Sequence, residues 1–65
     1  MKTEFKGKKG KKEADEFFKK NKYNILGVYE LTDGTKIVNY KIKNDIWHEY
    51  IPNNNDSLYF LIKVS

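Results

Sequence analysis

Residues 25–43 read ILGVYELTDGTKIVNYKIK, two apolar-rich segments separated by Asp33 and Gly34. An Asp-Gly pair between such segments is a strong hairpin signal, because both residues tolerate the left-handed backbone that a tight turn requires. The sequence therefore predicts an antiparallel hairpin whose strands occupy residues 25–32 and 35–43.

The length of the hairpin loop decides which side chains share a face. We expect a two-residue loop, which pairs Glu30 with Ile37. A three-residue loop is the alternative, and it pairs Glu30 with Lys36, Val28 with Val38 and Leu26 with Tyr40. The two-residue loop gathers six large side chains on one face, which we expect to be the core side: Ile25, Tyr29, Leu31, Val38, Tyr40 and Ile42.

The rest of the chain predicts one helix and further strands. Ala14, Phe17 and Phe18 form one apolar stripe at helical spacing, which indicates a helix over residues 12–22 with acidic residues in its first turn. Residues 46–51 alternate as a third strand, and residues 58–64 form a strand that is apolar on both faces. Such a strand belongs inside a sheet or at a dimer interface. The predicted fold class is α+β: one short N-terminal helix packed on a small antiparallel sheet of three to five strands, a β-meander containing the Asp33-Gly34 hairpin.

Basic residues are concentrated in the first third of the chain. Residues 1–22 hold nine lysines against four acidic residues, whereas residues 23–65 hold four lysines against five. We expect residues 1–11 to be a basic flexible arm or a short edge strand, and residues 12–65 to be a single small α+β domain. There is no run of about 20 apolar residues and no apolar segment behind the first lysines, so we expect a cytoplasmic protein without a membrane span.

The residue types present exclude several classes of chemistry. The chain has no cysteine and only one histidine, His48, which excludes disulfides, thiolate metal sites and Cys-His catalysis. His48 and Glu49 are adjacent in a strand and point to opposite faces, so they form no dyad. The segment Asn53–Asp56 lacks the spacing of a calcium loop, and Gly7–Lys12 lacks that of a phosphate-binding loop. We therefore expect neither an enzyme nor a metal or other cofactor.

The leading functional prediction is a basic nucleic-acid-binding module. Its lysines would contact the phosphate backbone while aromatic rings stack on bases. All 13 basic residues are lysine. Without guanidinium groups, which read guanine by paired hydrogen bonds, contact should be non-specific. The candidate phosphate-binding residues are Lys6, Lys8, Lys9, Lys11, Lys12, Lys19, Lys20 and Lys22, and the candidate stacking residues are Tyr23, Trp47, Tyr50 and Tyr59.

The alternative prediction is a protein that binds another protein. Abundant Lys, Asn, Ile, Tyr and Phe suit an AT-rich coding sequence, such as that of a phage or mobile element, whose small proteins could inhibit or modulate a host or defence protein. In the two-residue register, the face away from the core carries Leu26, Val28, Glu30, Ile37, Asn39 and Lys41, which is apolar for a surface. The candidate interface residues are Leu26, Val28, Ile37, Leu58 and Phe60, and a homodimer could form through the C-terminal strand.

Overall fold

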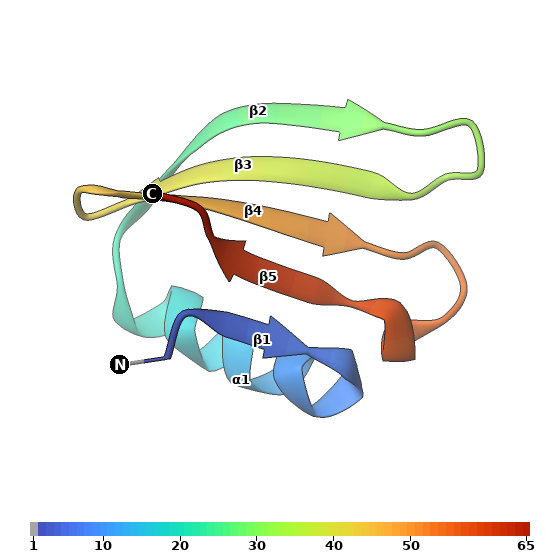
Figure 1. Cartoon of the computed structure of the whole chain (residues 1–65), viewed down its shortest axis with the longest axis horizontal. Helices are drawn as coiled ribbons and strands as arrows, with labels where there is room; N and C mark the ends of the chain where they lie inside the picture. Colours follow the sequence, from blue (N-terminus) through green and yellow to red (C-terminus); the bar gives the residue numbers. More distant parts are fainter. Residues whose placement is uncertain (1) are drawn as a thin grey trace.

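The computed structural model describes residues 2–65, which form one α-helix and one five-stranded sheet (Figure 1). The elements along the chain are β1 (Glu4–Lys6), α1 (Gly7–Lys20), β2 (Tyr23–Glu30), β3 (Lys36–Ile42), β4 (Asp45–Ile51), the 3-10 turn η1 (Asp56–Leu58) and β5 (Phe60–Lys63). All strand pairs are antiparallel, and the order across the sheet is β1-β5-β4-β3-β2. The predicted α+β fold, with one helix on an antiparallel meander, is confirmed.

The hairpin lies where the sequence places it, but its loop has three residues. The amide of Leu31 donates to the Thr35 carbonyl (2.8 Å), and the amide of Gly34 donates to the Leu31 carbonyl (3.0 Å). Gly34 has a φ of +88°, whereas Asp33 keeps a negative φ and accepts a hydrogen bond from the Thr35 amide (2.9 Å). The two-residue loop needs positive φ at both central positions, while the three-residue loop needs it only at the last. The predicted two-residue loop, and the strand register that follows from it, are therefore wrong.

The observed register pairs Glu30 with Lys36 and Val28 with Val38, as the three-residue alternative predicts. A bulge at Leu26 then shifts the pairing, so that Ile25 rather than Leu26 lies opposite Tyr40. Because side chains alternate along a strand, the three-residue loop turns Tyr29 away from the helix and Val28 toward it, whereas the bulge returns Ile25 to the helix side.

Only half of the predicted hairpin core is buried. Val38, Tyr40 and Ile42 on β3 are buried as expected, but Ile25, Tyr29 and Leu31 are exposed. β2 lies at the edge of the sheet, and α1 packs mainly on β1, β5 and η1 at the other end (Figure 1). Alternation of apolar residues identified the strand, but the uncovered edge position leaves its side chains in water.

The C-terminal strand occupies the interior of the sheet, which is one of the two positions predicted for it. β5 pairs with β4 on one side and with β1 on the other. Its Leu61 is fully buried on the helix side, whereas Phe60 and Ile62 lie on the opposite face and remain partly exposed. Since both backbone edges of β5 are already paired, a dimer cannot form by strand addition to β5.

The helix begins at Gly7, five residues earlier than predicted, and follows β1 directly. Gly10 makes this start possible, because a Cβ at that position would lie 2.8 Å from the carbonyl carbon of Phe5. Gly10 thus allows α1 to lie close against β1. The acidic residues expected in the first turn consequently lie in the middle of α1, and the first turn contains none.

Aromatic rings fill the space between α1 and the sheet. The ring of Phe17 lies 5.1 Å from that of Trp47 and 5.4 Å from that of Phe5 between centroids. The ring of Phe18 lies 4.8 Å from that of Tyr40. These contacts bury one face of the sheet and leave the opposite face without a covering layer.

Candidate functional site

The face of the sheet opposite α1 carries a row of side chains, one from each strand. Cross-strand pairing places Tyr29, Ile37, Tyr50, Phe60 and Lys6 side by side in that order. Tyr29 is 56% exposed, and Ile37, Tyr50 and Phe60 are partly exposed. We call these residues the aromatic row. It presents three aromatic rings across an uncovered sheet.

The aromatic row ends at the most basic part of the surface. The Lys6 ammonium lies 5.5 Å from the centroid of the Phe60 ring, within cation–π range, and 3.6 Å from a carboxylate oxygen of Glu4. Lys6 directly precedes α1, whose first six residues carry Lys8, Lys9, Lys11 and Lys12 and no acidic residue. The positive end of the helix dipole adds to this field. We call Lys6, Lys8, Lys9 and Lys12 the basic end.

The structure divides the predicted phosphate-binding lysines into two groups. Lys6, Lys8, Lys9, Lys11 and Lys12 surround the start of α1, and Lys11 lies 3.5 Å from a carboxylate oxygen of Asp56. The second group follows the acidic middle of the helix and comprises Lys19, Lys20 and Lys22. Only the first group lies at the end of α1 that follows Lys6, the last member of the aromatic row.

The prediction that Trp47 and Tyr59 stack on bases is wrong. Trp47 and Tyr59 are each 3% exposed, because they point from the sheet into the layer filled by α1. Tyr23 is 45% exposed but lies on the helix side, with its ring against those of Phe18 and Tyr40. Tyr50 remains a candidate as a member of the aromatic row.

Sequence reasoning missed Tyr29 and Phe60 as partners of Tyr50. Phe60 was assigned to a protein interface, and the incorrect hairpin register placed Tyr29 on the core face. The signal that could have found the row was the three-residue loop, since it pairs Tyr29 with Ile37, the direct neighbour of Tyr50.

The predicted protein-interface residues are not gathered into one patch. Leu26 and Val28 lie on β2 and are 56% and 57% exposed, while Ile37 and Phe60 belong to the aromatic row. Leu58 lies on η1, is 60% exposed and lines the same surface hollow as Tyr50 of the row. We call the free side of β2, from Tyr23 to Glu30, the β2 edge.

Comparison with protein-family models, with curated proteins and with solved structures finds no match. We therefore infer function from the geometry of the chain itself.

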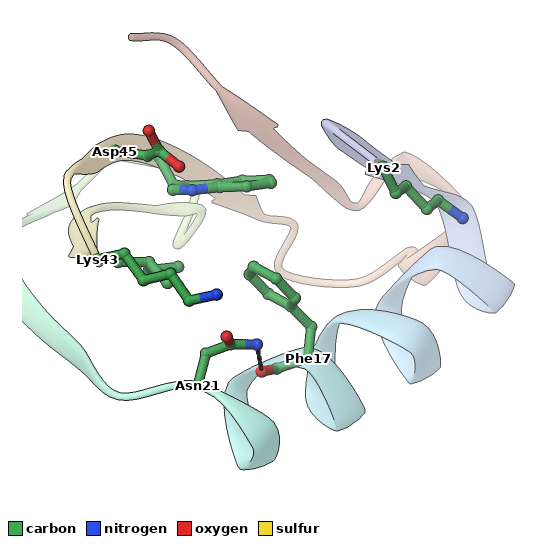
Figure 2. Close-up of a pocket in the computed structure, with 7 residues that line it drawn as sticks. Lys2, Phe17, Asn21, Lys43 and Asp45 are labelled. Carbon is green, nitrogen blue, oxygen red and sulfur yellow. Dashed lines mark hydrogen bonds between the residues drawn. The ribbon is translucent and has the colours of Figure 1, made fainter.

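A small cavity lies between the end of α1 and the β3–β4 turn (Figure 2). Its volume is about 90 Å³, room for roughly three water molecules. Trp47 lines it with a buried indole nitrogen that has no hydrogen-bond partner within residues 2–65, and the amide of Asn21 caps the Phe17 carbonyl at 2.9 Å. Known ligand pockets measure about 300–1,000 Å³, so this cavity is too small to enclose a typical organic ligand.

One ionisable side chain is buried within the sheet. Glu49 is 7% exposed and accepts hydrogen bonds from the hydroxyl of Tyr40 (2.6 Å) and from that of Tyr59. Burial, and then the hydrogen bond to Glu49, raises the pKa of both phenols well above the usual value. His48 is exposed on the opposite face of the same strand. The network is enclosed in the core and offers no substrate access, so it acts structurally.

Across residues 2–65, no group of three or more acidic or histidine side chains is arranged to hold a metal ion. In the same part of the chain, α1 is too short and too polar to cross a bilayer. The surfaces available for function are thus the aromatic row with its basic end and the β2 edge.

Proposed function

We propose that this chain is a small non-catalytic protein that binds single-stranded nucleic acid on the aromatic row. Bases stack on Tyr50, Phe60 and Tyr29, and the phosphate backbone leaves the row over the basic end. The observation that carries the proposal is the placement of Tyr50 beside Phe60, with Tyr29 on the far side of Ile37, in a row on an uncovered sheet that ends at Lys6.

The spacing of the row suits successive bases. Neighbouring strands lie about 4.8 Å apart, so Tyr50 and Phe60 are close enough to receive adjacent bases of an extended strand. Stacking requires bases that are free of a duplex, which favours single strands over double-stranded DNA. Lysines act as point charges on phosphates and carry no base preference, so the expected binding is non-specific for sequence.

Removal of a stacking ring tests the base-binding part of the proposal. Tyr50→Ala and Phe60→Ala should each weaken binding of a fluorescent single-stranded oligonucleotide about 5- to 150-fold, because a base–aromatic stack contributes roughly 1–3 kcal/mol. Val64→Ala removes an exposed apolar side chain beside Ile46, at the other end of β4 from Tyr50, and should leave the affinity unchanged. Equal affinities for all four proteins in fluorescence anisotropy, on both DNA and RNA, would refute stacking on the row.

Two double substitutions with the same charge change test the basic end. Lys8→Gln with Lys9→Gln should weaken binding and flatten its dependence on salt, by a slope of about 0.7 for each lysine that neutralises a phosphate. Lys19→Gln with Lys20→Gln removes the same charge from the other end of α1 and should have the smaller effect. If the second pair has the larger effect, the phosphates follow the helix surface rather than the end of the row.

A second candidate function is recognition of another protein, as expected of a mobile-element protein that modulates a host or defence protein. The observation that favours it is the apolar surface outside the row, above all Leu26 and Val28 on the β2 edge. Affinity capture from a nuclease-treated lysate should then recover one defined protein from the host with the wild type and lose it with Leu26→Lys. Recovery that depends on nucleic acid alone would reject this candidate.

A further inference from the structure

The β2 edge is an unprotected pairing surface. β2 is eight residues long and is hydrogen-bonded to β3 on one side only, and Figure 1 shows it as the outer border of the sheet. Natural edge strands are usually blunted by lysine, proline, a β-bulge, short length or a covering element. β2 carries no lysine or proline, and the bulge at Leu26 is the one such device along its described length.

Large apolar side chains project from both faces of this strand and from the residue after it. Each is about half exposed: Tyr23, Ile25, Leu26, Val28, Tyr29 and Leu31. Together they present on the order of 500 Å² of apolar surface, near the upper end for the largest patch on a monomeric protein. Antiparallel pairing would bury the outer backbone of β2 and the flanks of these side chains, which is part of the ~800 Å² that each partner buries in a standard stable interface.

From these features we propose that the β2 edge is a homodimer interface, in which β2 pairs antiparallel with β2 of a second copy. This inference goes beyond the proposed function and shares one residue with it, since Tyr29 belongs to both β2 and the aromatic row. The other members of the row and the basic end lie outside the β2 edge. A two-fold axis perpendicular to the sheet joins the two five-stranded sheets into one and keeps both helices on the same side.

The opposite edge of the sheet explains why the assembly closes at two copies. β1 has only three residues, includes Glu4 and Lys6, and is packed against α1. A head-to-tail contact between β2 and β1 of another copy would therefore match a long apolar strand with a short charged one. Pairing of β2 with β2 matches identical surfaces. It occupies the β2 edge of both copies and leaves no β2 edge for a third copy.

The bulge at Leu26 selects the register. Pairing about a two-fold axis requires opposed residues to share a face, and the faces of β2 exchange at the bulge. The register that pairs the whole strand places Ile25 opposite Val28 of the second copy and puts the axis beside Leu26. Glu30 is the one charged residue of β2. In this register Glu30 of one copy lies near Lys22 of the other at each end of the paired strands, so the two charges are complementary.

Mass in solution tests the dimer directly. The wild type should sediment at about twice the 7.8 kDa of the chain across micromolar concentrations. Val28→Lys should sediment as a monomer, whereas Leu58→Lys, which puts the same charge on an equally exposed site away from β2, should remain a dimer. A monomeric wild type, a dimeric Val28→Lys or a wild type that grows into larger species would each overturn the proposal, and the first of these would leave β2 open to a foreign protein.

A cross-link tests the interface without relying on the folding of a charged variant. Because the chain has no cysteine, Leu26→Cys introduces a single thiol, and the axis beside it brings the two copies within disulfide reach. Oxidation should convert Leu26→Cys to a covalent dimer on a non-reducing gel and leave Leu58→Cys mostly monomeric. Equal cross-linking of the two variants would contradict the placement of the axis.

Discussion

At the scale of single residues, Glu49 connects three strands through the core. Its carboxylate lies on β4 and accepts hydrogen bonds from Tyr40 on β3 and from Tyr59 just before β5. A buried carboxylate without such donors would be costly, so both phenols must stay protonated for the sheet to keep its packing. Burial and the neighbouring Glu49 raise the pKa of both Tyr40 and Tyr59 for this reason.

This network predicts a loss of stability in alkali. The phenols of the unfolded chain ionise near pH 10, whereas those of the folded chain ionise at higher pH. Above pH 10 the folded state thus holds protons that the unfolded state has lost, so the free energy of unfolding falls as pH rises and is fully retained below pH 10. Urea unfolding between about pH 8 and about pH 11 should show this fall.

The double variant Tyr40→Phe with Tyr59→Phe provides the control for the alkaline loss. It removes both titrating phenols and leaves Glu49 unpaired, so it should be less stable at pH 8 but should lose less stability on going to alkaline pH. An identical decline in the wild type and the double variant would assign the alkaline loss to other groups.

At the scale of the elements, α1 meets β1 through Gly10. Ala is favoured over Gly in a helix by about 1 kcal/mol, so helix propensity alone predicts that Gly10→Ala is stabilising. The new Cβ would, however, lie 2.8 Å from the carbonyl carbon of Phe5, and α1 would have to shift away from β1. We expect overpacking, typically about 1–3 kcal/mol, to outweigh the gain and lower the urea midpoint. Lys12→Ala, at an exposed position of the same helix, should leave it nearly unchanged, and a higher midpoint for Gly10→Ala would contradict the close packing.

The same elements show what could be predicted from the sequence. Periodicity identified the helix, the Asp33-Gly34 hairpin and the buried side chains of β3, because these are local patterns. The hairpin register depends on whether Asp33 joins Gly34 in the left-handed region, and an Asp-Gly pair is compatible with both loops. The start of α1 was missed because Gly7 and Gly10 permit close packing as readily as flexibility, and only the position of Phe5 distinguishes the two.

The candidate site was harder to predict than the fold, because it depends on which face is covered. Trp47 and Tyr50 are both aromatic residues of one strand, and alternation places them on opposite faces without showing which face α1 occupies. The aromatic row also depends on pairing between strands that are distant in the sequence. Charge density shows that the lysines of the basic end are close together in the sequence, but it does not give their position at the end of the row.

At the scale of the whole molecule, stability is unevenly distributed across the sheet. β5 and β4 are paired on both sides and lie under α1, whereas β2 is held by β3 alone. Within a monomer, β2 should therefore open most readily, because few buried contacts resist its separation. A second copy on the β2 edge would instead make β2 harder to open, because it would pair the free backbone groups and cover the apolar side chains.

Hydrogen exchange measures this difference strand by strand. In the wild type we expect the amides of β2 to be protected nearly as well as those of β3, since the second copy supplies the missing partners. In Val28→Lys, protection should fall in β2 while β4 and β5 keep theirs, because the substitution changes the interface and not the core under α1. A uniform fall across all strands would indicate a destabilised monomer, and unchanged protection in β2 would mean that its outer backbone is already exposed to water in the wild type.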